Sequence, residues 1–585
     1  MSVILRIDMA RQRVSEEPAP DEYRLLGGRA LTARIISREV DASIHPLAPE
    51  AKLVFAPGLL GGTAITTSGR TSFGAKSPLM NGLKESNVGG VLGHKLAKLG
   101  IKAVIIERAP DASDDGLWVL HIGADRSWRF EPADGLRGLG NYDTAARLLE
   151  GASSKTRAVV SIGPAGEMRM AAASIAVNDP EGRPTRHAAR GGLGALMGAK
   201  GLKAIVIDDG DLTPRGEPRS PSPTSGEGSA RARRAVVDAA DPAAFREGML
   251  AFSKVVLDDP RTANLSKTGT AGVIKFVNRD NVHSMPTRNH RLGTMPTADN
   301  IGGIRIAEIG AERGGKMLPC MAGCIIKCAI LYNAADGSHI TTALEFETIA
   351  LLGSNLEIDD VDAVAQMDRL CDDIGLDTIE MGNAFGVAME AGVLPWGDWR
   401  AVIRTFEEDV RAGTPLGRIL GGGTEHVART FGIDRIPAVK GQGLPAWEPR
   451  TLKAMGITYA TSPQGADHTA GLVTARGVSP ETLLKSSRHE QIIMAAVDSV
   501  GLCQFSNPVE ADMASLVSAM HGVTWTKDDV LALGRRVRIE ERAFNIAAGF
   551  GRDAETLPEF LRTEPLHTSE GDQVFDVDDA LIDAF

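Results

Sequence analysis

Apolar positions change their spacing along the chain, and this change divides it into two regions. Before residue 212, short apolar runs are bounded by glycine, proline or charge, as in LVFAPGLL, IKAVIIERA, RAVVSIG and LKAIVIDD, which is typical of buried strands. Further along, apolar residues recur at helical steps, as in VDAVAQMDRLCDDIGL and RHEQIIMAAVDSVGL. No short-period repeat is visible. The pattern predicts mixed α/β structure followed by helices.

A polar segment separates these regions. In LTPRGEPRSPSPTSGEGSARARR, proline, serine, glycine and charge replace apolar residues, so we expect a linker or exposed loop over 213–235. A chain of 585 residues is long enough for several domains. We predict an α/β base domain over 1–212, a helical domain over 236–436 and a second helical domain over 437–585.

Composition and charge narrow the function classes. The hydrophobic content of 43% and aromatic content of 4% are those of a soluble globular enzyme. A net charge of −11 argues against general nucleic-acid binding. The opening MSVILRIDMARQRVSEEP has no apolar signal segment, and no apolar run reaches the length of a membrane span. We therefore expect a cytoplasmic protein in a thiol-reducing compartment, with no nucleic-acid or membrane partner.

Four of the five cysteines form a divided set. Cys320, Cys324 and Cys328 lie in PCMAGCIIKC, and Cys503 lies far downstream in VDSVGLCQF. Together they could close a tetrathiolate site for an iron–sulfur cluster of the 4Fe-4S type. Zinc is the rival ligand, although structural zinc sites prefer paired C-x2–4-C knuckles. Packing as a small apolar side chain explains Cys371 better than it explains the triplet.

The pattern D-x-x-G-L occurs twice, each time after an amphipathic helical stretch. Asp372 to Asp377 reads DDIGLD, and Asp498 to Cys503 reads DSVGLC. Taken alone, such a segment is a helix C-terminus with a solvated acid, because glycine commonly ends helices. Two copies, one ending in the distant cysteine, predict a pair of equivalent loops that hold the two halves of a pseudo-symmetric ligand.

Two glycine-rich segments with cations lie in the first 212 residues. Glycine permits close backbone approach, and free N–H groups beside Arg or Lys bind phosphate. Neither segment has the spacing of a P-loop or a Rossmann fingerprint, so we expect a phosphate-bearing cofactor other than an ordinary nucleotide. The residues are Arg70, Lys76, Asn87, Gly89 and Gly90 in the first segment and Arg190, Gly191 and Gly192 in the second.

In the order of its motifs, the chain resembles the tungsten-containing aldehyde:ferredoxin oxidoreductase family from about residue 3 to residue 510. The motifs are YRLLGGRAL, SGRTSFGAKSPL, SNVGG, IGPAGE, ARGGLGALMGAKGLKAI, MPTRN, the cysteine triplet, LEFETIALLGSN, DDIGLDT, AVKGQGLPAWEPR, GITYATSPQGADH and DSVGLCQF. The resemblance implies an α+β fold, with an N-terminal β-sheet base domain followed by two mostly α-helical domains. It also implies a tungsten (or molybdenum) bis-pyranopterin, a 4Fe-4S cluster and a Mg2+ ion bridging the pterin phosphates.

The resemblance assigns residues to these cofactors. Asp372 and Asp377 would hold one pterin, and Asp498, Leu502 and Cys503 the other. The cluster ligands would be Cys320, Cys324, Cys328 and Cys503. Segments that meet the pterins and their phosphates in the family contain Arg70, Lys76, Asn87, Gly89, Gly90, Arg190, Gly191, Gly192 and Lys440.

Two positions depart from the family pattern. The best-known members have C-x2-C-x3-C, whereas this chain has C-x3-C-x3-C, and steps of four on a helix would keep the thiols on one face. Trp447 in PAWEPR stands where aldehyde-oxidising members tend to have tyrosine. The second departure leaves the substrate open, with an aromatic aldehyde favoured.

The resemblance implies oxidation of an aldehyde to a carboxylic acid, with electrons passed through the cluster to ferredoxin or a ferredoxin-like iron–sulfur subunit. His468 in GADH matches the family's active-site histidine, and LEFET offers Glu345 or Glu347 for its glutamate. We favour Glu345 with His468 for acid–base work and keep Glu347 in reserve.

Two alternatives remain. Within the family, the chain could be the catalytic subunit of a complex that reduces an acid or an aromatic acyl-thioester at low potential. From another class, it could be a non-catalytic iron–sulfur electron carrier. A homodimer and a hetero-complex are both left open.

Overall fold

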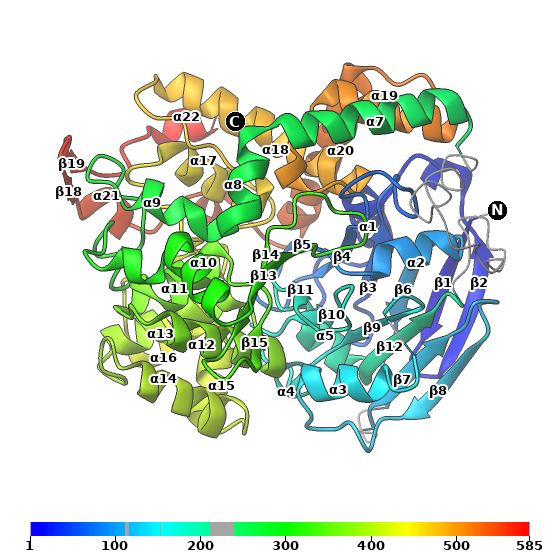
Figure 1. Cartoon of the computed structure of the whole chain (residues 1–585), viewed down its shortest axis with the longest axis horizontal. Helices are drawn as coiled ribbons and strands as arrows, with labels where there is room; N and C mark the ends of the chain where they lie inside the picture. The colour runs from blue at the N-terminus through cyan, green and yellow to red at the C-terminus, as the bar shows by residue number, and fades with distance from the viewer. Residues whose placement is uncertain (1, 112–115, 153, 211–238, 584–585) are drawn as a thin grey trace.

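The computed structural model describes residues 2–111, 116–152, 154–210 and 239–583 (Figure 1). The linker predicted over 213–235 lies outside the described residues. Strands fill the first part of the chain and helices most of the remainder, so the expected α+β arrangement is confirmed. The four strands predicted from apolar runs are present as β3, β6, β9 and β12. No helix in the described ranges is both long and apolar enough to cross a membrane.

The first sheet has six strands in the order β2-β1-β6-β3-β4-β5. β1 runs parallel to β6, and the other neighbours are antiparallel. Helix α1 (Gly28–Glu39) connects β2 to β3, and α2 (Leu92–Lys98) connects β5 to β6. The strands are β1 (Val3–Asp8), β2 (Arg13–Pro18), β3 (Leu53–Pro57), β4 (Thr71–Lys76), β5 (Leu83–Val88) and β6 (Ile101–Glu107).

The second sheet repeats the first. Its order is β8-β7-β12-β9-β10-β11, with β7 parallel to β12 and the other neighbours antiparallel. Helices α3 (Asn141–Leu148) and α5 (Leu193–Ala199) take the places of α1 and α2, and α4 (Pro164–Glu167) is an addition. The strands are β7 (Trp118–Ile122), β8 (Trp128–Pro132), β9 (Arg157–Ser161), β10 (Ile175–Val177), β11 (Arg186–Ala188) and β12 (Leu202–Asp208).

The repeat is visible in the sequence once the strands are aligned. VGGVLGHKLAKLGIKAVIIE leads into β6, and RGGLGALMGAKGLKAIVID leads into β12. The two sheets share one apolar core, in which Phe55 and Phe73 stack with ring centroids 5.0 Å apart. The N-terminal region is therefore a pair of similar halves.

The helices form two groups around this base (Figure 1). The first group contains α9 (Ile274–Val277), α10 (Gly303–Glu312), α11 (Phe346–Leu352), α12 (Val361–Ile374), α13 (Thr378–Glu390), α14 (Trp399–Arg404), α15 (Pro415–Gly421), α16 (Thr424–Phe431), α17 (Lys453–Thr461), α21 (Phe560–Thr563) and α22 (Asp579–Asp583). The second contains α7 (Pro242–Asp258), α8 (Pro260–Thr268), α18 (Pro480–Val500), α19 (Glu510–His521) and α20 (Lys527–Ala547).

Packing crosses the predicted border between the helical domains. α7 begins the region expected as one domain, yet it packs against α19, while α17 and α21 share a core with α11 to α13. The boundary at 436 stays a prediction.

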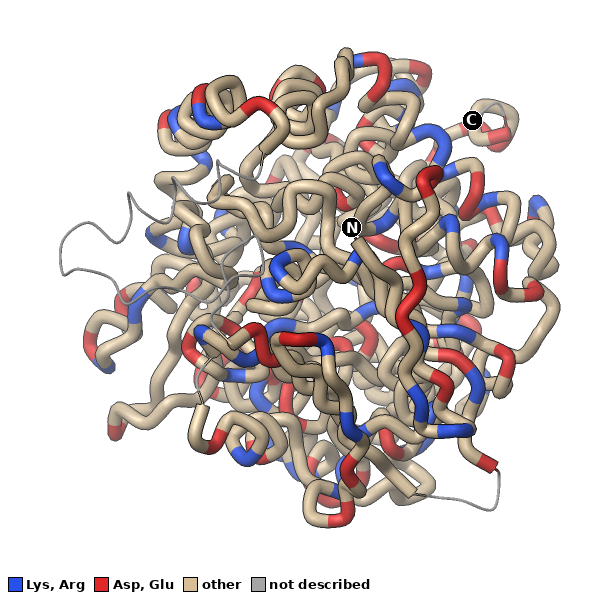
Figure 2. The backbone as a smooth tube through the Cα atoms, turned by 90° about the vertical axis from the view of Figure 1, so that its right-hand side faces the viewer, with Lys and Arg blue, Asp and Glu red and all other residues tan. Residues whose placement is uncertain are grey.

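The short strands are β13 (Lys316–Leu318), β14 (Ala329–Asn333), β15 (His339–Thr341), β16 (Ala438–Val439), β17 (Gln442–Gly443), β18 (Leu566–Thr568) and β19 (Gly571–Gln573). Acidic and basic residues are interspersed along the tube in Figure 2.

The D-x-x-G-L segments end two helices, as predicted. α12 stops at Gly375 (φ 81°) and α18 at Gly501 (φ 89°), both left-handed. Each of these glycines also packs against a second glycine, which follows a strand of the base. A Cβ on Gly501 would lie 2.7 Å from the Cα of Gly58, and one on Gly375 would lie 2.9 Å from the nitrogen of Gly163. Only glycine fits both the conformation and the contact.

We predict that Gly501→Ala lowers the thermal unfolding midpoint more than Gly477→Ala does. Both glycines have positive φ, but a Cβ on Gly477 would meet nothing within 4 Å. The control therefore carries only the backbone strain of about 1–3 kcal/mol, whereas Gly501→Ala also forces two segments apart. Equal midpoints for the two variants, by circular dichroism or calorimetry, would contradict this packing constraint.

Candidate functional site

The cysteine triplet lies in a loop and not on a helix. Cys320, Cys324 and Cys328 follow one another between β13 and β14. The expected helical face was wrong because Gly323 (φ 80°) and Lys327 (φ 54°) adopt left-handed backbone that interrupts any helix. The loop, rather than a helical period, brings the thiols together.

The four thiols of the divided set lie close to one another. A hydrogen bond with Cys324 lowers the pKa of Cys320 to about 6, although burial opposes it. Burial, followed by nearby charges that include Cys320 and Cys503, raises the pKa of Cys328 well above its usual range. Cys371 lies apart, fully buried in α12 within the core of the first helical group.

The spacing of these thiols bears on the choice between zinc and an iron–sulfur cluster. In the described part of the chain, no three His, Cys, Asp or Glu side chains are close enough to share one metal ion. Zinc needs all its ligands at about 2.0–2.3 Å from one centre. A cluster holds each thiolate on a different iron, so it requires a wider spacing of the thiols.

Arg70 and the first glycine pair, Gly89 and Gly90, lie beside the thiols. Arg70 donates to the side-chain oxygen of Asn87, and its guanidinium lies in the field of the Cys503 and Cys320 thiols. The N–H of Gly90 donates to the carbonyl of Cys320 at 2.9 Å. A Cβ on Gly89 would lie 3.4 Å from the Cys320 sulfur. These glycines bring the base into contact with the cysteine loop.

The second D-x-x-G-L loop is held by a buried ion-pair network. Asp498 accepts from Arg29 at 3.3 Å, and Arg29 pairs with Glu541 at 2.8 Å. Burial raises the pKa of Asp498, and burial with the Asp498 charge raises the pKa of Glu85 to about 8. Leu502 is fully buried in the same apolar cluster as Cys324 and Cys328. The loop thus joins a carboxylate cluster to the thiol set.

The first loop has its own partners. Asp377 caps α13 through the N–H of Ile379 at 3.0 Å and accepts from Arg190 at 3.2 Å. Asp372 lies 3.1 Å from His187 and accepts from Tyr142 at 3.4 Å. Arg190 also donates to the carbonyl of Gly443 at 2.6 Å.

The remaining predicted residues lie in different places. Lys76 donates to the carbonyl of Ala42, at the opposite end of β4 from Arg70. Lys440 donates to the carbonyl of Ala460 at 2.5 Å, and burial lowers its pKa to about 8. The carbonyl of Gly191 accepts from Ser77 at 2.6 Å, and Gly192 (φ 75°) precedes α5. The structure therefore does not bring Lys76 to the thiols.

Glu345 lies near the thiol set and Arg186. It accepts from the Thr270 hydroxyl at 2.7 Å, and its carboxylate lies 3.8 Å from Arg186. Its side chain keeps 35% of its surface accessible, yet burial raises its pKa. Arg186 also lies in the field of the Cys320 thiol, and it was missed from the sequence.

Glu347, rather than Glu345, lies beside His468. One Glu347 oxygen is 3.5 Å from His468 Nδ1, and the other accepts from the N–H of Ala446 at 2.7 Å. Glu347 Oε1, His468 Nδ1 and Trp447 Nε1 are among the buried polar atoms of the described residues that make no hydrogen bond. The Trp447 ring packs edge-on against Phe346 at 5.1 Å. Buried atoms without partners normally meet a ligand or water.

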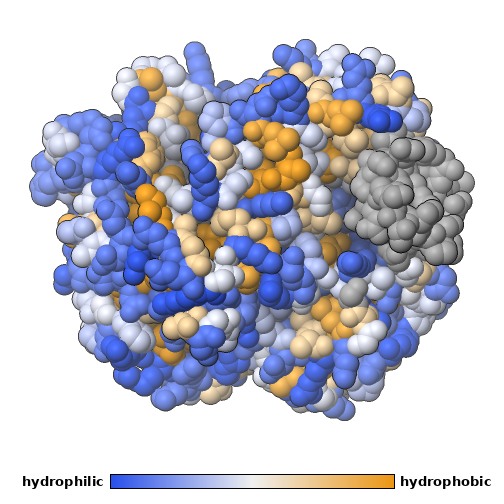
Figure 3. Space-filling view, viewed as in Figure 1, coloured by the Kyte–Doolittle hydropathy of each residue, from blue (hydrophilic) through white to orange (hydrophobic). Residues whose placement is uncertain are grey.

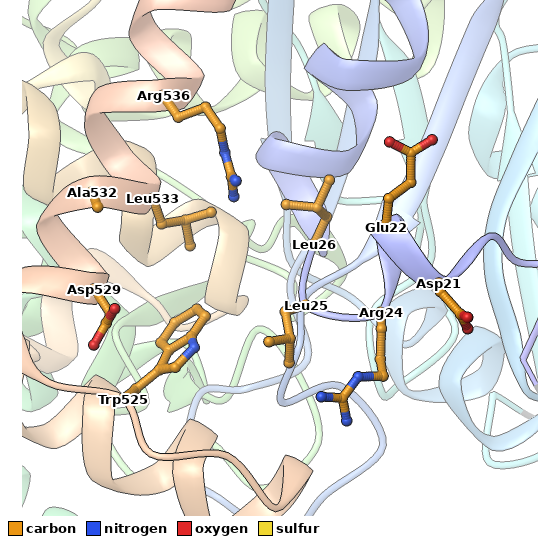
Figure 4. A pocket seen from close by; sticks show the side chains of 10 residues that line it. All are labelled: Asp21, Glu22, Arg24, Leu25, Leu26, Trp525, Asp529, Ala532, Leu533 and Arg536. Carbon is orange, nitrogen blue, oxygen red and sulfur yellow. The ribbon is translucent and has the colours of Figure 1, made fainter.

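A surface pocket of about 450 Å³ lies elsewhere (Figure 4). It is formed by the segment before α1 and by α20, with Trp525, Leu26 and Leu533 on its apolar side and Arg24 and Arg536 at its edge. It contains none of the residues predicted from the sequence. The residues predicted from the sequence therefore lie away from this pocket.

Two site residues that were not predicted from the sequence occupy equivalent positions in the two halves of the base. Glu85 and His187 both stand four positions before the glycine pair of their half, and they face Asp498 and Asp372 respectively. Aligning the two halves of the base would have found both.

Comparisons with known proteins agree with this architecture. The family model for aldehyde ferredoxin oxidoreductase matches as its N-terminal domain over residues 4–209 and as its domains 2 and 3 over residues 249–585. The chain is 30% identical to the tungsten-containing aldehyde ferredoxin oxidoreductase of Pyrococcus horikoshii, covering 96% of this chain and 91% of that protein.

Two further proteins are more distant. The aliphatic sulfonate oxidoreductase, WOR-like subunit, of Pyrococcus furiosus is 25% identical over 93% of this chain and 86% of its own length. The solved active site complex BamBC of benzoyl coenzyme A reductase has a TM-score of 0.76 at 19% identity, over 95% of this chain and 90% of that one. The fold is thus shared beyond the aldehyde-oxidising members, while both family models together account for nearly all of this sequence. By this match the chain belongs to the tungsten-containing aldehyde ferredoxin oxidoreductase family, a family of oxidoreductases.

Proposed function

We propose that the chain is a tungsten (or molybdenum) bis-pyranopterin, iron–sulfur oxidoreductase of the cytoplasm. It oxidises an aldehyde to a carboxylic acid and passes the electrons to ferredoxin or a similar iron–sulfur protein. The observation that carries the proposal is the group of unpaired polar atoms on Glu347, His468 and Trp447, buried in a chain of this family.

The residues present fit the implied cofactors. Cys320, Cys324, Cys328 and Cys503 would hold a 4Fe-4S cluster, and the two D-x-x-G-L loops would each hold one pterin. Arg70 and Arg190 lie near these loops and would neutralise pterin phosphates, together with a bridging Mg2+. When bound, the metal supplies a Lewis acid and a two-electron acceptor.

The protein's own groups then perform the proton chemistry. Glu347 Oε1 accepts no hydrogen bond and lies 3.5 Å from His468 Nδ1, so it takes a proton from the water that attacks the carbonyl carbon. His468 Nδ1 and the Trp447 indole N–H are free to donate to the developing oxyanion. Aldehyde and water together yield the carboxylic acid, two protons and two electrons. Sequence reasoning favoured Glu345 for this role, but the contact with His468 supports Glu347.

The neighbours of this group support an aromatic substrate. The indole of Trp447 and the ring of Phe346 form an apolar corner next to the polar atoms. Such a corner favours a flat ring and offers no hydroxyl beyond the reacting group. We therefore propose an aromatic aldehyde.

The alternative of a larger reductase complex has support from names alone. One relative is described as a WOR-like subunit, and the solved neighbour is an active site complex. Purification of this chain with stoichiometric iron–sulfur or flavin subunits would favour that function, as would reduction of an aromatic acyl-thioester.

We predict that Glu347→Gln and His468→Asn lose aldehyde oxidation while keeping near-normal tungsten or molybdenum and iron. Loss of one acid–base group typically costs ~10²–10⁴-fold. Activity is measured anaerobically with benzaldehyde, cinnamaldehyde and acetaldehyde and a low-potential dye, and metals are measured by elemental analysis.

Glu345→Gln is the matched control. It alters a carboxylate two residues away that contacts Thr270 and Arg186 instead of His468. We expect its dye-linked activity to stay within a few-fold of the parent. Greater loss in Glu345→Gln than in Glu347→Gln would return the catalytic role to Glu345. Full activity in His468→Asn would remove that residue from the reaction.

A second prediction separates the divided set from the remaining thiol. Cys324→Ala should abolish or alter the cluster, whereas Cys371→Ala should leave it intact because Cys371 is buried within α12. Iron content and the EPR spectrum of the reduced protein measure the outcome. Equal loss of iron in both variants would contradict the assignment, and full iron in Cys324→Ala would remove that ligand.

A further inference from the structure

Lys84 is a lysine buried in the interior of the protein. Hydrophilic side chains cover much of the face shown in Figure 3, and lysines normally lie on such a surface. Lys84, on β5, is only 1% exposed. Its stem packs on the second glycine-rich segment, because a Cβ on Gly191 would lie 2.4 Å from the Lys84 Cγ. A lysine buried this deeply is almost always paired, so its partner indicates what it does.

The partner is Asp467, the residue directly before His468. The Lys84 ammonium donates to Asp467 Oδ2 at 2.5 Å. The other oxygen, Oδ1, accepts from the backbone N–H of Thr469 at 3.0 Å and from its hydroxyl at 2.8 Å. Both carboxylate oxygens therefore have hydrogen-bond donors other than the histidine.

The His468 ring lies near two carboxylates and is bonded to neither. Its Nδ1 is 3.5 Å from Glu347 Oε1 and 4.0 Å from Asp467 Oδ1, and it makes no hydrogen bond. A ring N–H is attracted more strongly to a carboxylate that has no cation beside it. Because Lys84 neutralises Asp467, the ring stays available to Glu347.

Arg190 lies near the same carboxylate but has other direct partners. It pairs with Asp377 at 3.2 Å and donates to the carbonyl of Ala466. Burial would raise the pKa of Asp467, but the charges of Lys84 and Arg190 outweigh burial and hold that pKa below its usual range. Asp467 is therefore ionised, and Lys84 is the cation in direct contact with it.

We infer that Lys84 is a positioning residue for the oxidation, which holds Asp467 and so keeps the His468 ring available to Glu347 and the substrate. The inference rests on the proposed function, in which Glu347 and His468 perform the proton chemistry. In this role Lys84 acts through Asp467 and makes no bond to the aldehyde. Without the ammonium, the bare carboxylate binds the ring and takes it out of position.

The test removes the ammonium alone and then both charges. In a crystal structure of Lys84→Met, we expect His468 Nδ1 to donate to Asp467 at no more than about 3.2 Å. The kcat of this variant for benzaldehyde, with a low-potential dye, should fall about 10²-fold, as for a misplaced group, while KM changes by less than a few-fold. Lys84→Met/Asp467→Asn should return kcat to within a few-fold of the parent, because the amide oxygen still accepts from Thr469 but carries no charge.

Lys203→Met is the matched control for the loss of a buried cation. Lys203 is fully buried on β12, where its ammonium binds Glu167 at 2.5 Å and the carbonyl of Leu139 at 2.8 Å. We expect this variant to lower the thermal unfolding midpoint and to keep kcat within a few-fold of the parent. Tungsten or molybdenum and iron are measured in every variant.

The outcomes separate this inference from the proposed function. An unmoved His468 ring in Lys84→Met overturns the inference, as does a double variant no more active than the single one, or an equal loss of kcat in Lys203→Met. Loss of tungsten or molybdenum from the double variant also overturns it, because Lys84 would then hold the cofactor. A moved ring in Lys84→Met supports the positioning role even when the parent oxidises no aldehyde, which overturns only the function.

The double variant keeps the test decisive if Lys84→Met does not fold. It removes both members of the buried pair, which costs far less stability than leaving one charge unpaired. A parent-like ring position with kcat within a few-fold of the parent supports the inference. A displaced ring, or a loss of more than about 10-fold in kcat, overturns it.

Discussion

Two contacts between helix ends and strand ends determine where the candidate site lies. Gly501 closes α18 against Gly58, and Gly375 closes α12 against Gly163. No side chain fits between the partners, so each helix end is fixed on the base with little freedom. The residues just after these glycines then take defined positions, which is the preorganisation that a large cofactor requires. Because the base is a repeated unit, the two positions correspond.

The two halves of the base have the same strand order, but the charged residues that face their D-x-x-G-L loops differ. Asp498 faces Arg29 and Glu85, whereas Asp372 faces His187 and Tyr142. The loops also end differently. The first ends in Asp377, which turns to Arg190, and the second ends in Cys503, which belongs to the thiol set. The repeat therefore supplies a symmetric frame, and the differences within it place the thiol set beside the second loop.

Much of the fold could be predicted from the sequence because it depends on local signals. Apolar runs marked strands such as β12, and D-x-x-G-L marked the ends of α12 and α18. The cysteine loop could not be predicted in this way. Steps of four suggest a helix, but Gly323 and Lys327 adopt left-handed backbone, and the loop packs on Gly269 at the end of α8 and on Gly89 of the base. Long-range contacts decided the conformation there.

The site showed the same division between local and long-range information. The residue types were predictable, since thiols, carboxylates and cations stand in motifs. Their pairing was not, because Arg186 and Glu541 stand in segments with no motif of their own and reach the site through the tertiary fold. Lys76 shows the converse, since it lies in a motif yet points to Ala42 at the far end of its strand.

The start of α11 explains why Glu345 and Glu347, two residues apart, lie in different environments. Glu345 precedes the helix with extended backbone (φ −78°, ψ 156°), and its side chain turns to Thr270 and Arg186. Glu347 lies in the first helical turn and turns to Ala446 and His468. Side chains on the two sides of a helix boundary diverge because the backbone changes direction there. The boundary thus separates a glutamate near the thiol set from a glutamate beside His468. The same α11 also carries Phe346 between them, so its ring against Trp447 closes the second side with apolar surface. The carboxylate beside His468 and the carboxylate near the thiols thus point away from each other at the start of one short helix.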